Sequence, residues 1–262
     1  MAAPTTRGRS YGQYCPLALA AELLCRRWTL LIISRLLDGC RSFNEIHQGV
    51  PQISPSLLTA RLNELIDAGL VERQPTDRAR RYRYEPTAAT LDLAPLVDGL
   101  AVWGQHWARD MEREDLDPAF LAWSMSMRMN TQAMPPGRTV IRFEFAGTPA
   151  GLKRFWLVCE AQAVDMCVKD PGHEASLIVE APLRTFVEAW RGIRDLPAEL
   201  RRGTIRLVGP RALVRAFPNW LLLSALAPHP RKAAGREQTL ARAPARAQEA
   251  SVSARKPISR RK

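Results

Sequence analysis

The 262-residue sequence has little of what membrane proteins and familiar enzymes need. Its apolar runs are short, and none approaches the roughly 18 residues that a membrane-spanning helix requires. The first ten residues contain no apolar stretch of the kind found in a secretory signal peptide, so we expect no leader of that type. No G-x-S-x-G, Walker-type phosphate loop or H-E-x-x-H motif is present. These absences argue against a membrane protein and against the enzyme classes that those motifs define.

Cysteine and histidine are scarce. The chain has five cysteines without any C-x-x-C pair, and four scattered histidines. An odd number of cysteines without a framework of spacings predicts free thiols in a reducing compartment, which we take to be the cytoplasm. The histidine spacing does not suggest a zinc site, and we expect neither a metal nor a cofactor.

The formal net charge of +12 is concentrated at the C-terminal end. Residues 228–262 carry ten basic and two acidic side chains and almost no large apolar ones. Such a segment buries too little surface to offset the entropy of ordering, so we predict a disordered basic tail. The tail could add non-specific DNA affinity or be an idle solvated extension. The overall charge therefore does not establish nucleic-acid binding.

Chain breakers divide the remainder. Asp117-Pro118 and the run Met134-Pro135-Pro136-Gly137 enclose a Met-rich stretch that we interpret as a connector, helical in its middle. The predicted organisation is a DNA-binding and dimerisation domain over 1–117, a connector over 118–137, a second domain over 138–227 and the tail over 228–262. The predicted fold class is α+β, with a mostly helical first domain that ends in a two-stranded hairpin.

The sequence pattern of the first domain predicts helices followed by a two-stranded hairpin. Residues 16–37 keep an apolar helical stripe with a break near 25–28, and Gly39 ends it. Ser42 and Glu45 form a capping-box pattern that opens a short helix over 43–48. Ser54 is a good N-cap and Pro55 suits the first turn of the next helix, which ends at Gly69. Residues 70–73 and 81–86 alternate as two strands around a polar turn over 75–79.

The helix that begins after Ser54 has two unlike faces. Leu58, Leu62 and Leu65 recur on one side, whereas the other side shows small polar residues. Two helices joined by a tight turn allow the second to enter the major groove of DNA, where short polar side chains reach base edges. The following hairpin adds arginines suited to phosphates or to the minor groove. The candidate DNA-binding residues are Gln52, Ser54, Pro55, Ser56, Thr59, Asn63, Arg78, Arg80, Arg81 and Arg83.

The same pattern also occurs in folds that do not bind DNA, where an arginine-rich turn is simply solvated. A family resemblance favours the DNA-binding interpretation. It is carried by Cys15-Pro16-Leu17, Arg27-Trp28-Thr29-Leu30-Leu31-Ile32, Gly39-x-Arg41-Ser42-Phe43-Asn44-Glu45-Ile46, Ile53-Ser54-Pro55-Ser56-Leu57-Leu58-x-x-Arg61-Leu62-x-Glu64-Leu65 and Gly69-Leu70-Val71-x-Arg73. Over about residues 11–110 the chain resembles the HxlR family of bacterial transcriptional regulators. The resemblance implies a winged helix-turn-helix that binds operator DNA as a homodimer, although the turn over 76–81 is longer and richer in arginine than usual.

A dimer also has support in the residues. Leu96, Leu100, Trp103 and Trp107 recur at helical spacing and form one bulky apolar seam. Both tryptophans could belong to the core of a single chain. A seam between two subunits would instead place two recognition helices about one DNA turn apart.

The cysteines receive separate interpretations. Cys15 occupies the position that the resemblance links to redox or electrophile sensing, and it precedes the Pro16 helix start, where a thiol pKa can fall. An inert, partly buried thiol is the alternative. We expect Cys25 and Cys40 in the core, and Cys159 and Cys167 on apolar strands.

From residue 138 the pattern changes to strands over 139–146, 155–160, 163–169 and 176–180, a helix over 182–191, a strand over 203–211 and a helix over 212–217. The Leu183…Phe186…Trp190-x-Gly192 and Gly203-x-Ile205-x-Leu207-x-Gly209 patterns resemble the sterol-carrier-protein-type fold. That resemblance implies a sheet roofed by helices around an apolar cavity. The candidate effector-binding residues are Phe186, Trp190, Leu213, Phe217 and Trp220, for which plain hydrophobic core is the alternative.

No paired carboxylates and no nucleophile with an adjacent base indicate an enzyme. We therefore expect a homodimeric, sequence-specific regulator that binds double-stranded operator DNA, with an apolar small-molecule effector in the second domain and no membrane partner. The alternative is a carrier of lipid or another small apolar ligand whose first domain serves only for dimerisation.

Overall fold

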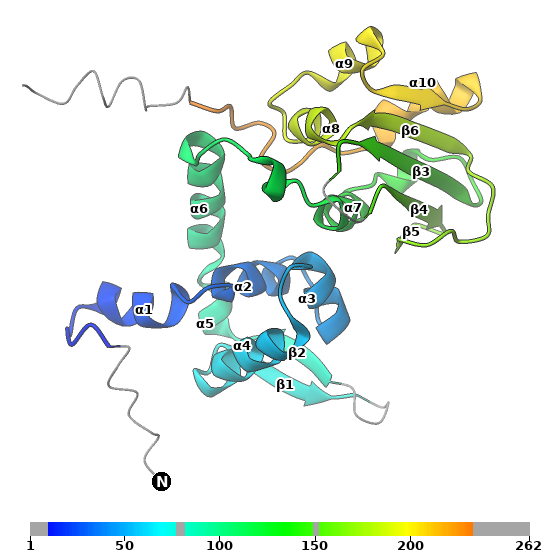
Figure 1. Cartoon of the computed structure of the whole chain (residues 1–262). Helices are drawn as coiled ribbons and strands as arrows, with labels where there is room; N and C mark the ends of the chain where they lie inside the picture. Colours follow the sequence, from blue (N-terminus) through cyan, green and yellow to red (C-terminus); the bar gives the residue numbers. More distant parts are fainter. Residues whose placement is uncertain (1–9, 77–81, 149–151, 233–262) are drawn as a thin grey trace, which may run out of the picture.

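The computed structural model describes residues 10–76, 82–148 and 152–232, which form two lobes joined by helices (Figure 1). The N-terminal lobe is mostly helical and ends in a two-stranded hairpin. Its elements are α1 (Pro16–Leu24), α2 (Thr29–Leu37), α3 (Phe43–Gly49), α4 (Pro55–Asp67), β1 (Val71–Pro75) and β2 (Tyr82–Pro86). The helix expected over 16–37 is split at the predicted break, where Trp28 has a left-handed backbone with φ of 79°.

Local caps account for the boundaries of α3 and α4. Ser42 accepts a hydrogen bond from the backbone N–H of Glu45, and the Glu45 carboxylate accepts one from the backbone N–H of Ser42, so the predicted capping box is confirmed. Ser54 Oγ accepts from Leu57 N at 3.3 Å, and Pro55 occupies the first turn, where no N–H is needed. The five residues between α3 and α4 thus form a short turn with a fixed exit direction.

The leucine face of α4 lies in the core of this lobe. Leu58, Leu62 and Leu65 are each at most 1% exposed and pack with apolar residues of α2 and α3. The hairpin is attached to the same body, because Tyr84 N donates to Arg41 O and Glu85 pairs with Arg41 at 2.8 Å. The N-terminal lobe therefore holds α4 from one side and leaves the other side in solvent.

Three further helices and two 3-10 turns lead to the second lobe. These are α5 (Ala88–Leu91), α6 (Ala94–Trp107), the 3-10 turn η1 (Arg113–Asp115), α7 (Pro118–Ser126) and the 3-10 turn η2 (Thr131–Ala133). The segment expected as a connector is helical in its middle, as predicted, but α7 is not a loose tether. Its side chains belong to the cores of both lobes: Trp123 to the first, and Leu121, Ala122 and Met125 to the second.

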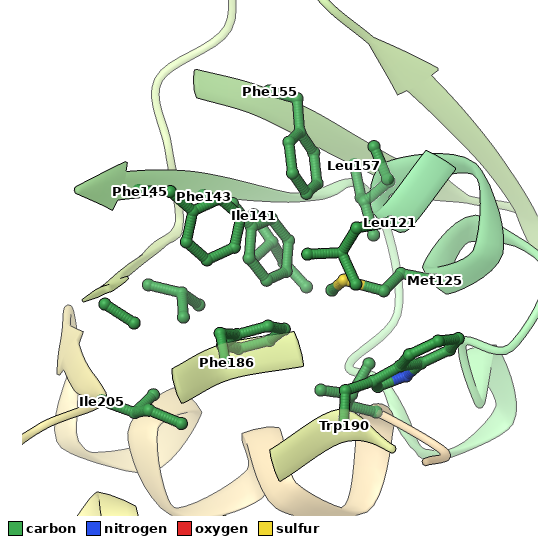
Figure 2. Packing of buried hydrophobic residues seen from close by; sticks show 14 of the residues in the cluster. Leu121, Met125, Ile141, Phe143, Phe145, Phe155, Leu157, Phe186, Trp190 and Ile205 are labelled. Carbon is green, nitrogen blue, oxygen red and sulfur yellow. The ribbon is translucent and has the colours of Figure 1, made fainter. Parts of the chain in front are cut away.

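The C-terminal lobe is a five-stranded sheet with helices on one face. Its elements are β3 (Thr139–Ala146), β4 (Arg154–Glu160), β5 (Ala163–Cys167), β6 (Leu177–Pro182), α8 (Leu183–Trp190), α9 (Leu196–Arg202), β7 (Arg206–Val208) and α10 (Arg211–Trp220). The strand order is β5-β4-β3-β6-β7, with β3 and β6 parallel and the other pairs antiparallel. Aromatic side chains fill the space between sheet and helices (Figure 2), where the Phe143 and Phe155 rings stack at 4.8 Å between centroids.

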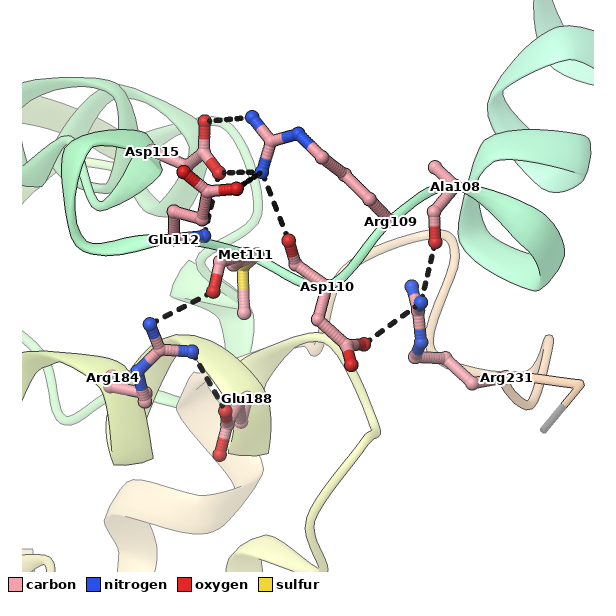
Figure 3. A network of polar contacts seen from close by, with 9 residues as sticks. All are labelled: Ala108, Arg109, Asp110, Met111, Glu112, Asp115, Arg184, Glu188 and Arg231. Carbon is pink, nitrogen blue, oxygen red and sulfur yellow. Dashed lines mark hydrogen bonds and ion pairs between the residues drawn. The ribbon is translucent and has the colours of Figure 1, made fainter. Parts of the chain in front are cut away.

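The structure differs from the sequence expectations in several elements. The short helices α5 and α9 were not predicted, and β7 is shorter than the expected strand over 203–211. The tail was expected to be disordered from residue 228, but its first five residues have defined contacts. Arg231 donates to Ala108 O at 2.5 Å and pairs with Asp110 at 3.0 Å, which ties the segment to the end of α6 (Figure 3). Residues 233–262 lie outside the described part of the chain.

The lobes are also linked at the end of α6. Arg184 on α8 donates to Met111 O at 2.9 Å, and Arg191 beyond α8 donates to the amide oxygen of the buried Gln105 (Figure 3 shows the Arg184 contact). The Gln105 amide in turn donates to Arg191 O at 3.2 Å. The second lobe therefore contacts the first at α6 as well as through α7.

Candidate nucleic-acid interface

The polar side of α4 faces solvent. Ser54, Pro55, Ser56, Thr59 and Asn63 are all exposed, opposite the buried leucines. The structure thus brings these five candidate residues onto one continuous surface at the start and along the first turns of the helix. The first backbone N–H groups of a helix carry a partial positive charge, which favours an anion such as phosphate at this end.

The hydroxyl groups of this surface keep hydrogen-bonding capacity for a partner. Ser54 Oγ and Ser56 Oγ lie 3.2 Å apart, and Thr59 Oγ1 donates to Pro55 O at 3.0 Å. Because a hydroxyl has one donor and two acceptor sites, Thr59 can still accept a hydrogen bond and present its methyl group outward. Short side chains held in this way suit close approach to base edges.

Gln52 lies in the turn before α4, but its side chain is directed elsewhere. Its Nε2 donates to Asp117 Oδ2 at 2.7 Å, at the start of α7. Unlike the five exposed residues at the start of α4, Gln52 therefore contacts the N-terminal end of α7. Its predicted contact with DNA remains a prediction.

The hairpin contributes Arg83 in the described part of the chain. Its side chain is 55% exposed, and its Nε lies 3.0 Å from Glu85 Oε1. Arg73 on the neighbouring strand stacks over the Tyr82 ring with its Cζ 4.6 Å from the centroid. Arg78, Arg80 and Arg81, which carry the rest of the predicted wing contact, lie outside the described residues.

An ion-pair cluster that the sequence reasoning missed holds the other end of α4. Glu64 Oε2 lies 3.1 Å from Arg26 Nη1 and 2.7 Å from Arg61 Nη1, and Arg61 Nε donates to Arg27 O at 3.0 Å. These contacts join α4 to the junction of α1 and α2. The spacing of Arg61 and Glu64, three residues apart on a helix, was the available local signal.

The seam on α6 is open to solvent in the single chain. Leu96, Leu100, Trp103 and Trp107 are 62%, 53%, 60% and 50% exposed, so the alternative that both tryptophans belong to the core of a single chain is wrong. Helix α1 likewise has no buried residue, and Leu17 is 76% exposed. The Lys232 ammonium lies 5.5 Å from the Trp107 ring centroid, so the C-terminal segment reaches the end of the seam.

Two of the five cysteines are exposed, two are buried, and Cys167 on β5 is partly exposed. Cys15 is exposed at the N-cap of α1, and Cys25 is also exposed, so its predicted core position is wrong. Helix α1 ends just before Cys25 and packs little against its own chain, which leaves that thiol in solvent. Cys40 and Cys159 are buried, and burial raises the pKa of each thiol to about 11.

The candidate effector residues lie in packed core. Phe186, Phe217 and Trp220 are at most 1% exposed, Trp190 is 8% exposed, and Leu213 packs at the edge of the same cluster. Grooves of about 580 and 470 Å³ on this lobe are lined by other residues. In this conformation the five side chains fill the space expected for a ligand, as in the core alternative.

Within the described ranges, no group of His, Cys, Asp and Glu side chains is arranged to hold a metal ion. Those ranges also contain no helix that is both long enough and apolar enough to cross a bilayer.

A short helix, a tight turn, a capped helix with an outward polar face and a two-stranded hairpin define a winged helix-turn-helix, a class of DNA-binding protein. Residues 23–112 match the family described as HxlR-like helix-turn-helix. The chain is 32% identical over 111 residues to the uncharacterized HTH-type transcriptional regulator YvaP of Bacillus subtilis, covering 42% of this chain and 95% of YvaP. The chain belongs to the HxlR-like helix-turn-helix family of transcriptional regulators.

Two further comparisons involve YodB of the same organism. The chain is 46% identical over 61 residues to the HTH-type transcriptional regulator YodB, covering 23% of this chain and 54% of YodB. The solved structure of its reduced form is 34% identical, covers 36% of this chain and 93% of that chain, and has a TM-score of 0.32. The family match ends at residue 112, before α7.

Proposed function

We propose that this protein is a homodimeric regulator that binds a specific operator sequence in double-stranded DNA and responds to an apolar small molecule in its second lobe. The observation that carries the first part is the division of α4 into a buried leucine face and an exposed polar face. A helix held from behind in this way can enter a major groove without disturbing its own core.

Base reading is assigned to α4 and phosphate binding to the hairpin. Ser54, Ser56, Thr59 and Asn63 offer hydroxyl and amide groups to base edges, and Pro55 fixes the start of the helix. Arg83, together with Arg78, Arg80 and Arg81 in the turn, supplies cations for the backbone or the minor groove.

Dimerisation is assigned to the α6 seam. Four large apolar side chains, each at least half exposed on one helix face, form a surface that a second copy would cover. A two-fold axis there would relate two α4 helices, and an operator with half-sites about 34–36 Å apart would match the two-fold symmetry.

Effector control, and the sterol-carrier-like character from which it follows, are assigned to the second lobe. Because Phe186, Trp190, Leu213, Phe217 and Trp220 are packed together, an apolar ligand would have to displace them. Binding would then favour a second arrangement of this lobe and shift the DNA-binding equilibrium by its differential affinity for the two arrangements.

The carrier alternative assigns no role to the polar face of α4 or to the hairpin arginines, since neither lies on the α6 seam. The test is selection of duplexes by the full chain from a random pool, followed by titration of the selected duplex at several salt concentrations. A chain shortened after Lys232 keeps the packed residues and removes most of the basic tail. We expect the shortened chain to keep its preference for the selected duplex. A protein that binds DNA only through its positive charge would lose nearly all affinity on this truncation and would show no sequence preference before it.

A further inference from the structure

Helix α7 is shared between the two lobes. Leu121, Ala122 and Met125 face the aromatic core of the second lobe, whereas Trp123 is 6% exposed and packs into the core of the DNA-binding lobe. Figure 2 shows Leu121 and Met125 directed toward the rings under the sheet. A displacement of α7 would therefore disturb two cores at once, since protein interiors are packed too densely to absorb it locally.

On the side of the DNA-binding lobe, Trp123 covers a largely buried cation. Arg35 on α2 has its Cζ 4.4 Å from the Trp123 ring centroid and 5.7 Å from that of Phe120. Its side chain is 13% exposed and pairs with Asp38 at 3.3 Å, while its Nε–H has no acceptor among the described residues. The two ring faces thus supply part of the stabilisation that the buried guanidinium would otherwise obtain from water.

The same contact reaches the end of α3. A Cβ atom on Gly49 would lie 2.3 Å from Arg35 Cδ and 3.0 Å from Trp123 Cζ2. Glycine allows this close approach, because a side chain at this position would force the Arg35 side chain or the Trp123 ring to move. Gly49 is the last residue of α3, directly before the turn that leads into α4.

A second contact joins α7 to that turn. Asp117 caps α7, with Oδ1 accepting from the N–H groups of Ala119 and Phe120 at 2.9 and 3.1 Å. Its other oxygen accepts from Gln52 Nε2 at 2.7 Å. One carboxylate thus fixes the start of α7 and the chain two residues before the N-cap of α4.

We infer that α7 positions α4 for base reading, with Trp123 and Asp117 as positioning residues of the DNA site. The inference rests on the proposed DNA-binding function and adds to it a device that lies beyond the matched family region. Trp123 holds α2 and α3 through Arg35 and Gly49, and Asp117 holds the turn through Gln52. Together they set the direction in which α4 leaves the turn.

The physical consequence concerns specificity more than total affinity. Hydrogen bonds to base edges require the helix in a fixed register, whereas phosphate contacts by long, exposed arginines tolerate small shifts. Loosening α7 should therefore lower affinity for the selected duplex and leave affinity for random duplex nearly unchanged.

The experiment compares full-length variants on the duplex selected by the wild-type chain and on random duplex of equal length at one salt concentration. Trp123→Leu removes the ring over Arg35, and we expect the specificity ratio to fall at least about fivefold. Trp123→Phe keeps an aromatic ring over Arg35, so its specificity ratio should stay close to that of the wild type. Trp156→Leu is the matched control, because Trp156 is 8% exposed on the sheet face away from α7, and its ratio should equal that of the wild type.

Asp117→Ser provides a second variant for the case that Trp123→Leu does not fold. Serine is a good helix N-cap but places no carboxylate within reach of Gln52, so the cap is kept and the contact with the turn is lost. A fall in its specificity ratio with an unchanged melting temperature supports the inference. A wild-type ratio in folded Asp117→Ser, or in folded Trp123→Leu, overturns it. Failure of the wild-type chain itself to select any duplex would refute the proposed function instead.

Discussion

Glu64 on α4 and Arg26 between α1 and α2 form an ion pair, with 3.1 Å between Oε2 and Nη1. Arg61 contacts the same carboxylate oxygen at 2.7 Å. Burial acts to raise the pKa of Glu64, but the hydrogen bonds from the two arginines outweigh it, so the pKa lies below its ordinary value of 4.5. The C-terminal half of α4 is thereby tied to the region that precedes α2, independently of α7.

Glu64→Gln should destabilise the protein near neutral pH by about 0.5–1 kcal/mol, as expected for a partly exposed ion pair. Since the pKa of Glu64 is lowered by folding, its stabilising contribution is present above pH 4.5 and is lost as the pH falls below that value. Urea unfolding at pH 7 and pH 3.5 should thus show a difference between wild type and variant that shrinks in acid. Glu72→Gln, on the exposed hairpin, is the control, and an equal effect there would contradict the assignment.

Leu100→Glu should shift the proposed α6 dimer toward monomer. A carboxylate in an apolar interface costs about 3 kcal/mol, which corresponds to a roughly hundredfold weaker dimer. Native mass spectrometry of the purified chain measures the subunit number directly. Ala101→Glu, exposed on the same helix but away from the seam, should leave the dimer intact. A wild-type chain that is monomeric at all concentrations would contradict the proposed interface.

Thr59→Ala and Arg83→Ala should change DNA binding in different ways. Loss of the Thr59 hydroxyl should reduce the difference in binding free energy between preferred and other base pairs by about 1 kcal/mol at the positions that Thr59 faces. Positions elsewhere in the site should change little. Loss of Arg83 should weaken binding to all sequences and reduce the salt dependence by about one phosphate contact. Footprinting and salt titration on the selected duplex distinguish the two effects. An unchanged footprint with both variants would contradict the assigned roles.

Native alkylation should separate the cysteines. Because burial raises the pKa of Cys40 and Cys159 to about 11, almost no thiolate is present at pH 7.5, and access is blocked as well. Iodoacetamide should therefore label the exposed Cys15 and Cys25 at least about tenfold faster, as read by peptide mapping. In urea all five should react. Labelling of Cys40 in the native chain at the rate of Cys15 would show that the core of the first lobe opens readily.

Local signals in the sequence were sufficient for most elements. Ser42, Glu45, Ser54 and Pro55 specify helix starts through contacts within four residues, so the positions of α3 and α4 are confirmed. The missed helix α9 carries the same kind of signal, with Asp195 as N-cap and Gly203 in a left-handed conformation at its end. It is seven residues long and lies between the predicted helix over 182–191 and the predicted strand over 203–211, where no element was expected.

Long-range contacts were not predictable in this way. Arg35 has the sequence character of a solvated charge, and its burial depends on Trp123, far along the chain. Likewise, the stripe of Phe186 and Trp190 is the same whether it lines a cavity or fills a core, because both require apolar side chains on one helix face. The sequence pattern does not show how closely these side chains pack, and the closeness of packing is what distinguishes a filled core from a ligand cavity.

The absence of a side chain at Gly49 restricts how this two-lobed architecture can be rebuilt. A chimaera that joins the second lobe to another helix-turn-helix would need glycine at that site, a guanidinium at the position of Arg35 and an amide at the position of Gln52. Without that set, α7 would lose its contacts with α2, with the end of α3 and with the turn before α4. The fit between α7 and the DNA-binding lobe therefore depends on three residues of that lobe, none of which lies on the outward face of α4.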